Sequence, residues 1–411
     1  MAIENYPVWT FEPNWSASVS ETLDWLTDVM AAPDGSEQRR SLRYFPRRSV
    51  EFAVAVGGED RQMLDNMLIT FGGARWYLPQ WHEVNLLDDA APAGTRFITS
   101  VDVRDRTGVR IDSVLCLIGD DAYTYEMVEV QSQHPNGVTV AAPLFRNWPR
   151  GSRVYQVNVA EMTDQPQLYP RTGNSVTSEI RFRIMDAEFG YFNEADANLT
   201  TVYRGSPVLI MEPDFRERMN IDYERNFSEI DNQTAVPQRV DEAKRPFTMR
   251  QYAWTLDGRL EHYRFEKMLQ LIRGRAIPLW VPTFMDDFTL TGPILAGSYS
   301  FEVGRCGFAA AGGPRWDRQD IMIETVSGVR IFRRIVGGFE YPGGERVNVD
   351  QAFTTSYPLT EILRISFVTL MRLNHDTVQI EHLTDTDGVS TSMLTFRSAP
   401  NTRIPLPAFR G

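Results

Sequence analysis

The sequence predicts a mostly β protein of the α+β class, made of two tandem homologous β-sandwich or barrel modules that are each flanked by a short α-helix. Three observations lead to this prediction. The second half of the chain repeats the first, runs of alternating apolar and polar residues outnumber helical patterns, and glycine- and proline-rich turns separate those runs.

The repeat appears when residues 7–58 are aligned with residues 207–258. Nine of these 52 positions are identical, whereas average composition would give about three by chance. Within the alignment, Glu12-Pro13-Asn14-Trp15 matches Glu212-Pro213-Asp214-Phe215. A period of about 200 residues indicates two domain-sized units, because solenoids repeat every 20–50 residues or so.

The boundary between the copies is expected near residues 196–206. A first β-rich module with inserted strands then covers residues 1–200, and a second, diverged copy covers residues 201–411. Two such copies in one chain can make one type of contact both within a chain and between chains. Closed rings follow from that geometry, and three chains would make a ring of six similar modules.

Each copy is expected to hold one short amphipathic helix. Apolar residues recur at helical spacing from Met63 to Phe71 and from Phe265 to Ile272, and glycine follows each run. A further helix is expected around Val19–Met30, with Ser18 or Ser20 as its cap. Strands are predicted where apolar and polar residues alternate, at 101–103, 128–130, 180–184, 321–324 and 378–381.

Composition narrows the function classes. The net charge of −12 argues against a chain that grips nucleic acid by charge alone. No run is long and apolar enough for a membrane helix, and the first residues lack the pattern of a signal peptide, so no membrane insertion is expected. Cys116 and Cys306 are too few for a disulfide framework or a zinc motif.

Candidate chemistry is sparse. The histidines lack the spacing of a helical metal site and are expected to be structural or on the surface: His82, His134, His262, His375 and His382. The acids considered as a glycosidase pair are Glu12, Glu212, Asp286 and Asp287. Because the Glu-Pro-Asn/Asp unit recurs, it is better explained as a shared turn in which the Asn or Asp side chain binds nearby backbone. The sequence therefore predicts no catalytic residue, metal ligand or cofactor, and no enzyme.

Basic and aromatic residues suggest contacts instead. The densest positive run is Arg39, Arg40, Arg43, Arg47 and Arg48, which is expected to pair with acids across an interface rather than to bind nucleic acid. Most of the tryptophans are expected in the core, with one or two at an interface: Trp9, Trp15, Trp25, Trp76, Trp81 and Trp148.

The order of elements carries a resemblance. A Gln-Arg segment, a proline-containing strand, a helix and a strand rich in Trp, Tyr and Pro follow one another in both copies. Further parts of the pattern are Tyr125–Val130, Val138–Leu144, Trp148–Gly151, Val154–Val157, Ile365–Asp376 and Val378–His382. This succession resembles the tail-tip structural proteins of long-tailed bacteriophages, of the distal-tail and baseplate-hub type.

The resemblance implies modules of the tail-tube type and a virion protein of the tail tip or baseplate, assembled in the host cytoplasm. Such a protein forms a ring, either a trimer with pseudo-six-fold symmetry or a hexamer, that continues the tail tube. Its partners are the tail tube protein and hub or fibre proteins, and DNA passes through its channel without specific binding. A protein of a related contractile or gene-transfer machine would share these features. The alternative from another class is a carbohydrate-binding or glycan-degrading β-protein of a tail or cell surface.

Overall fold

The computed structural model describes residues 4–99, 109, 111–185, 201–216, 219–234, 236–385 and 388–399. Strands account for 48% of the structure and helices for 8%. The paired strands of the described residues are antiparallel, so the expected mostly β class is confirmed. The finer expectation of two sandwich or barrel modules with a boundary near residues 196–206 stays a prediction, since residues 186–200 lie outside the described part.

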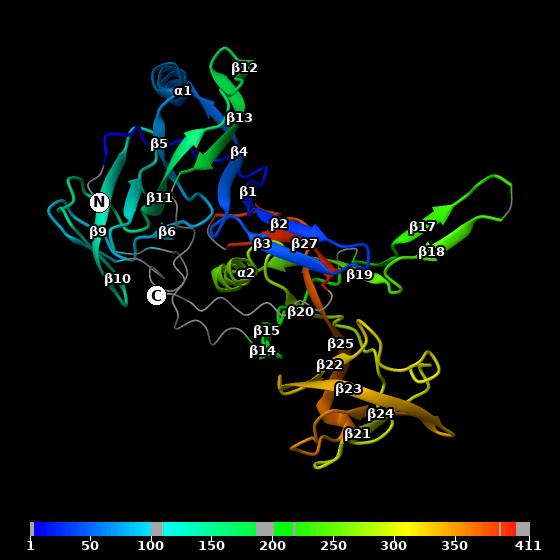
Figure 1. Cartoon of the computed structure of the whole chain (residues 1–411). Helices are drawn as coiled ribbons and strands as arrows, with labels where there is room; N and C mark the ends of the chain where they lie inside the picture. Colours follow the sequence, from blue (N-terminus) through cyan, green and yellow to red (C-terminus); the bar gives the residue numbers. More distant parts are fainter. Residues whose placement is uncertain are drawn as a thin grey trace.

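The first half contributes one α-helix and thirteen strands within the described residues (Figure 1). In chain order they are β1 (Val19–Asp24), β2 (Thr27–Ala31), β3 (Glu37–Ser41), β4 (Arg47–Gly57), α1 (Gly58–Phe71), β5 (Arg75–Pro79), β6 (Asn85–Leu86), β7 (Phe97–Thr99), β8 (Val114–Ile118), β9 (Tyr125–His134), β10 (Gly137–Val140), β11 (Arg153–Met162), β12 (Tyr169–Thr172) and β13 (Ser175–Ile184).

The second half follows a similar order. Its described elements are β14 (Val202–Tyr203), β15 (Ser206–Pro207), β16 (Asn220–Glu224), β17 (Phe227–Ile230), β18 (Gln238–Asp241), β19 (Phe247–Leu256), α2 (Arg259–Ile272), β20 (Leu279–Pro282), β21 (Ser300–Val303), β22 (Asp320–Thr325), β23 (Arg330–Tyr341), β24 (Gly344–Val349), a 3-10 turn (Leu359–Glu361), β25 (Ile362–Leu373), β26 (Thr377–His382) and β27 (Ser390–Ser398).

The strand pairings of the first half recur in the second. β4 pairs with β13 as β19 pairs with β27, and β11 pairs with β5, β8 and β13 as β25 pairs with β20, β22 and β27. The series β8–β9–β10–β7 corresponds to β22–β23–β24–β21. The chain thus repeats its long-range pairings as well as its local sequence.

Local contacts at the start of each half also match. Val8 bridges Tyr77 in parallel, and Val208 bridges Trp280 in the same way. Each of these contacts joins the chain before the first long strand to the strand that follows the helix. This shared contact places the repeated Glu-Pro-Asn/Asp unit beside the main sheet in both halves.

Among the described residues each half has a main hydrophobic core and a lobe core, and the second half has a further small cluster of Val208, Trp280, Met322 and Val368. The main core of the first half is formed by β4, β5, β11, β13 and α1, and a second core fills the lobe of β7 to β11. In the second half, β19, β20, β25, β27 and α2 form the main core, and the lobe of β21 to β25 has its own. The long strands β11 and β25 each run from a main core into a lobe, which ties the two parts together.

The amphipathic helix predicted in each half is confirmed. α1 ends at Gly72, and α2 ends in a left-handed turn at Arg273 and Gly274. The α2 face toward the sheet carries Phe265, Leu269 and Ile272, which are fully buried. This spacing of three and four residues is what places one face of a helix on a core.

The helix expected around Val19–Met30 is wrong. Residues of this segment form β1 and β2 instead. The buried positions of β1 are Val19, Glu21 and Leu23, an every-second pattern that a strand produces. The charged Glu21 lies between the two aliphatic residues, so the alternation of apolar and polar residues that marks a strand is interrupted in the sequence. The sequence alone does not show that Glu21 is buried.

The other strand predictions are confirmed where they can be followed. The alternating residues at 128–130, 180–184, 321–324 and 378–381 lie in β9, β13, β22 and β26. The run at 101–103 lies outside the described residues.

A pair of glycines occupies one matching turn in each half. Gly137 begins β10 and Gly344 begins β24, with φ of 158° and 159°. A Cβ on Gly137 would lie 2.1 Å from the Ile98 carbonyl oxygen, and one on Gly344 would lie 2.2 Å from that of Val303. Neither distance is compatible with a side chain, so both hairpins require glycine where two backbones approach.

We therefore expect Gly137→Ala and Gly344→Ala each to lower the free energy of unfolding by more than about 2 kcal/mol, measured by urea denaturation. The matched control is Gly73→Ala, where an added Cβ meets no atom within 4 Å. Loss of stability in all three variants, or in none, would contradict this explanation of the two glycines.

Candidate functional site: the junction between the two halves

The strand β1 joins the two halves. It pairs with β4 of the first half along one edge and with β26 of the second half along the other. The pairing with β26 is antiparallel and runs from Val19 opposite His382 to Asp24 opposite Thr377. Because both edges of β1 are used, the two main sheets are hydrogen-bonded to one another through this strand.

The side chains of β1 enter both main cores. Val19 belongs to the core of the first half, whereas Leu23 and the following Trp25 belong to that of the second. All three are at most 1% exposed. Burial of Leu23 and Trp25 in the second core removes a large apolar area from water, which holds the halves together.

Asp376 lies at the centre of a polar contact between the halves. Its carboxylate accepts hydrogen bonds from the backbone N–H and the hydroxyl of Thr27, at 2.8 and 2.9 Å, and from the N–H of Arg275 at 2.8 Å. The Arg275 guanidinium lies 3.1 Å away and also donates to the Thr27 carbonyl. Burial opposes the charge, but these N–H groups and the Thr27 hydroxyl hold the pKa of Asp376 below its usual value.

The β2–β3 hairpin of the first half contacts the second. Glu37 forms a two-pronged ion pair with Arg372 of β25, with N···O distances of 2.7 and 2.6 Å. Both side chains are less than 10% exposed. The hairpin turn at Gly35 lies against the ring of Phe247, close enough that a Cβ would overlap it. A buried bidentate pair fixes the hairpin's orientation because one displaced partner would leave the other charge unpaired.

A buried polar cluster occupies the middle of the junction. Glu21 of β1 lies within 2.7 Å of Arg48 and 3.1 Å of His382, and 3.9 Å from His82. Burial opposes ionisation of Glu21, yet Arg48 and the hydrogen bond from His382 hold its pKa well below the usual value. Burial lowers the pKa of both His82 and His382. His262 completes the group, and there Glu266 raises the pKa against the effect of burial.

The corresponding surfaces elsewhere in the chain are exposed. β16 takes the place of β1 in the second half but pairs only with β19 among the described residues, and β12 takes the place of β26 but pairs only with β13. All four residues of β12 and four of the five in β16 are exposed. The β17–β18 hairpin, which matches β2–β3, reaches out from the body (Figure 1).

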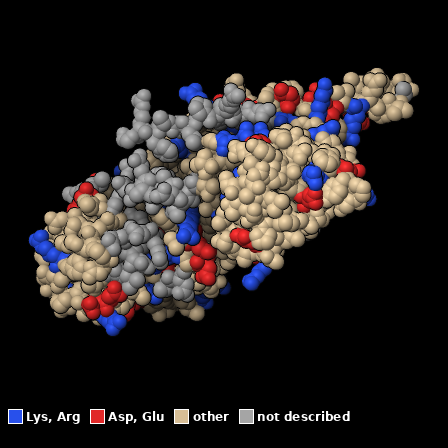
Figure 2. All heavy atoms as spheres, turned by 90° about the horizontal axis from the view of Figure 1, so that it is seen from below, with Lys and Arg blue, Asp and Glu red and all other residues tan. Residues whose placement is uncertain are grey.

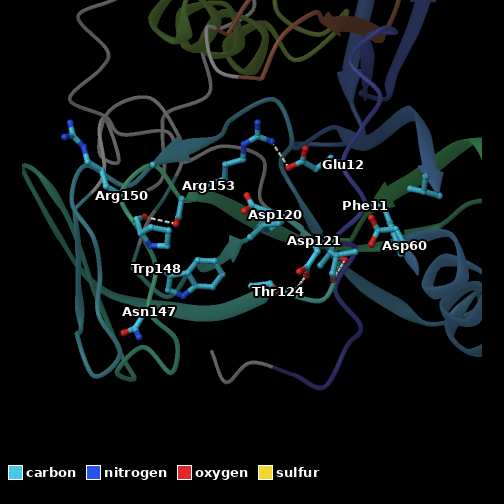
Figure 3. Close-up of a pocket in the computed structure, with 18 of the residues that line it drawn as sticks. Phe11, Glu12, Asp60, Asp120, Asp121, Thr124, Asn147, Trp148, Arg150 and Arg153 are labelled. Carbon is cyan, nitrogen blue, oxygen red and sulfur yellow. Dashed lines mark hydrogen bonds and ion pairs between the residues drawn. The ribbon is translucent and has the colours of Figure 1, made fainter. Parts of the chain in front are cut away.

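An open hollow of about 710 Å³ lies on the first half (Figure 3). Acidic residues from several segments line it: Glu12, Asp60, Asp120 and Asp121. Asp121 accepts hydrogen bonds from the backbone of Tyr123 and Thr124, and so fixes the β8–β9 turn. The aromatic residues that line the hollow, Phe11 and Trp148, are at most 3% exposed and offer no flat ring to a ligand.

Glu12 and Glu212 are held in matching ion pairs. Glu12 pairs with Arg153 at 2.6 Å, as Figure 3 shows, and Glu212 pairs with Arg364. Arg153 lies at the start of β11 and Arg364 near that of β25, which are corresponding strands. Each acid thus makes the same structural ion pair in its own half.

The shared turn predicted for this unit is confirmed. The Asn14 side chain accepts a hydrogen bond from the backbone N–H of Ser16 at 3.2 Å, and Asp214 accepts one from Arg216 at 2.9 Å. In each half, the backbone N–H of the Asn or Asp donates to an alanine carbonyl of the adjacent strand at 2.8 Å. Such local bonds are the reason that Asn and Asp favour turns.

The remaining candidate acids also have structural contacts. Asp287 accepts hydrogen bonds from the Thr283 hydroxyl and the Phe367 backbone, and Asp286 accepts one from the backbone of Ile365. The structure does not bring this pair together with Glu12 or Glu212 in a common hollow.

The histidines divide into two groups. His134 on β9 contacts Thr139 of β10 at 2.9 Å, and His375 lies exposed beside Asn374. His82, His262 and His382 are brought together from the segment after β5, from α2 and from β26. Sequence spacing missed this group because the three residues are far apart along the chain.

Two arginines of the basic run pair with acids within the chain. Arg43 pairs with Asp24 at 2.9 Å and Arg48 with Glu21 at 2.7 Å. Burial lowers the pKa of Arg39 to about 10. On the face seen in Figure 2, Lys and Arg lie interspersed with Asp and Glu, and wide areas carry neither.

The tryptophans follow the prediction of a core role. Among the six named in the sequence analysis, all but Trp15 are at most 3% exposed, and Trp15 is half-buried beside the first core. Cys116 is buried and Cys306 exposed, and both are free thiols. Burial raises the pKa of the Cys116 thiol.

Comparison with known proteins assigns no family. No protein-family model matches the chain, and no curated protein matches it. In the described part of the chain, no helix has the length and apolar character needed to cross a membrane.

Asp376→Asn is expected to lower the free energy of unfolding by about 2–4 kcal/mol at pH 7. The reason is that the variant removes the negative charge that pairs with the Arg275 guanidinium. The native pKa of Asp376 is below its unfolded value, so this stabilisation is present above the unfolded pKa. It is lost as the pH falls through the native pKa. The stability difference between wild type and variant should therefore shrink below about pH 4.

Urea denaturation at a series of pH values measures this difference. Asp28→Asn is the matched control, since Asp28 is exposed on the same strand as Thr27. A difference between wild type and Asp376→Asn that stays constant from neutral pH to acid would contradict the proposed role of the carboxylate.

Proposed function

We propose that this protein is a structural, ring-forming component of a phage tail tip or baseplate, and that it acts through assembly. Support comes from one observation above the others: β1 joins the two halves by adding to the edge of β26, while the corresponding strands β16 and β12 are exposed. One pair of edges is joined within the chain, and the corresponding pair is exposed. Head-to-tail rings form when such exposed edges pair between neighbouring chains.

The pairing partners between chains follow from the repeated register. Ser20 lies opposite Glu51 as Asn220 lies opposite Gln251, so Asn220 corresponds to Ser20. Ser20 itself lies opposite Glu381 within the chain.

The residues of β12 that correspond to those of β26 follow from the same comparison. Tyr169 pairs with Thr177, which pairs with Ala55. Glu381 pairs with Thr391, which pairs with Thr255, two hundred residues beyond Ala55. Tyr169 therefore corresponds to Glu381. Asn220 of one chain should lie opposite Tyr169 of the next, where an added strand gains backbone hydrogen bonds.

The projecting hairpin supports the same contact. β2–β3 lies against the second half, where Glu37 pairs with Arg372. β17–β18 and its turn instead expose four apolar side chains that a neighbouring chain would cover: Phe227, Ile230, Val236 and Val240. Exposed apolar residues gathered on one projecting element are typical of an assembly surface.

The contact between chains is expected to differ from that within the chain. Pro170 of β12 has no N–H and gives one hydrogen bond fewer than a residue such as His382 at the matching position. Assembly therefore depends more on the hairpin and on side chains. A reversible contact of this kind suits subunits that remain soluble before they add to a growing tail.

In this proposal the ring is a trimer with pseudo-six-fold symmetry or a hexamer, continues the tail tube, and contacts the tube protein on one side and hub or fibre proteins on the other. An acidic chain with interspersed charges lets DNA pass without holding it. The carbohydrate-binding alternative stays a prediction. In the hollow of Figure 3 the aromatic side chains are buried, so no observation there favours it.

The experiment is disulfide trapping in a Cys306→Ser background. The variant Tyr169→Cys/Asn220→Cys should form covalent oligomers under mild oxidation, because residues directly opposite in antiparallel strands have Cβ atoms close enough for a disulfide. Non-reducing gels, mass photometry and particle images with three- or six-fold symmetry are the measurements.

Two controls accompany it. Ser20→Cys/Glu381→Cys places two cysteines at the corresponding positions of the contact within the chain. It should give a cross-linked monomer. Tyr169→Cys and Asn220→Cys alone should give no more than dimers. A doubly substituted protein that stays monomeric at high concentration, in solution and on particles, would overturn the proposed ring.

A further inference from the structure

Three buried imidazoles meet at the junction of the two halves. His82, His262 and His382 are each at most 6% exposed. Each offers a ring nitrogen that lies within 4.8 Å of those of the other two. The rings of His82 and His382 are stacked, with centroids 3.9 Å apart, and that of His262 lies across them at 5.1 Å from His382.

One of these rings has a buried nitrogen that no hydrogen bond satisfies. His82 Nδ1 has no hydrogen-bond partner among the described residues. In contrast, His262 Nε2 lies 3.2 Å from Glu266 and His262 Nδ1 lies 3.2 Å from the Ser390 hydroxyl. An unsatisfied buried polar atom costs about 1–3 kcal/mol in general. Such an atom in a cluster of imidazoles is a sign that a binding partner satisfies it.

Carboxylates surround the histidines. Glu21 Oε2 lies 3.1 Å from His382 Nε2 and 3.9 Å from His82 Nε2, while Glu21 Oε1 is held by Arg48 at 2.7 Å. Glu266 lies 3.2 Å from His262 Nε2. One oxygen of Glu21 thus faces the imidazoles while a guanidinium orients the other, an arrangement common around metal-binding carboxylates.

We propose that His82, His262 and His382, with Glu21 as the fourth ligand, form a structural zinc site that clips the two halves of the chain together. Three imidazoles and one carboxylate are a ligand set that Zn²⁺ accepts with tetrahedral geometry. All four ligands come from the protein, so no position is left for a substrate. The role is therefore structural.

Binding requires a small local rearrangement. Zinc–nitrogen bonds of about 2.0–2.1 Å place two ligand nitrogens about 3.4 Å apart. The imidazoles must therefore approach one another, and His82 and His382 must tilt out of their stack so that the ion lies in the plane of each ring. Such changes involve side-chain torsions and leave the β1–β26 ladder in place.

The position of the ligands gives the site its effect. Glu21 and His82 belong to the first half, and His262 and His382 to the second. Metal binding to the folded junction therefore opposes its opening, since the separated halves present the ligands in pairs. This inference does not depend on the proposed ring or on a phage origin, and it can be tested on the monomeric chain.

The test uses the full-length, tag-free chain in a Cys306→Ser background, stripped of metal with a chelator. Titration with Co²⁺ should give the visible absorption of a four-coordinate site that saturates at one ion per chain, and Zn²⁺ should displace it. Zinc should also raise the melting temperature by at least about 3 °C. X-ray absorption of the zinc-loaded chain should show three imidazoles.

The variant His262→Asn should weaken cobalt binding at least 100-fold. The matched control His375→Asn changes an exposed histidine and should bind as the parent does. No saturable cobalt absorption in the parent, or full affinity in a folded His262→Asn chain, would overturn the site. The X-ray absorption measurement needs no variant, so a ligand shell without imidazoles would overturn it even if His262→Asn failed to fold.

Discussion

The arrangement of the whole molecule depends on the pairing of one short strand on both of its edges. β1 is the only described strand that hydrogen-bonds to sheets of both halves. A strand buried in this way must find partners for backbone groups on each side, because unpaired N–H and C=O groups away from water are costly. Register is fixed at the same time, since a slip by one residue would turn Leu23 out of the second core and bring a polar neighbour in.

Polar contacts at the junction fix the relative position of the two halves. Asp376 binds Thr27 and Arg275, and Glu37 binds Arg372, in addition to the apolar contact that Trp25 makes with the second core. These pairs contribute modest net free energy because their charges must first be desolvated. Their effect is to favour one relative position of the halves, since any other leaves a buried charge without its partner.

The two halves of the chain do not repeat this junction residue for residue. Glu21 lies opposite Val50, and its counterpart Ile221 lies opposite Arg250. A contact between chains through β16 would therefore carry an isoleucine where the contact within the chain carries the carboxylate of the polar cluster. In a ring, the two kinds of junction would alternate, and only the one within the chain would carry this carboxylate. Such a difference would allow one to be permanent and the other to form on assembly.

Sequence reasoning determined much of the local structure, because its signals are local. The alternation at Ile180–Ile184, the helix that contains Phe265 and the turn at Asn14 each depend on a residue's own neighbours. The repeat of residues 7–58 is likewise visible in the amino-acid sequence and does not require the tertiary structure.

Only the tertiary structure decided how the halves meet. The sequence predicted a helix around Val19–Met30, yet Glu21 is buried in a strand, where Arg48 and His382 from other strands compensate its charge. His82, His262 and His382 are separated by well over a hundred residues in each case, so no spacing rule could join them. Long-range pairing of β1 with β26 brings them together, and that pairing depends on packing of two cores rather than on any sequence pattern within one of them.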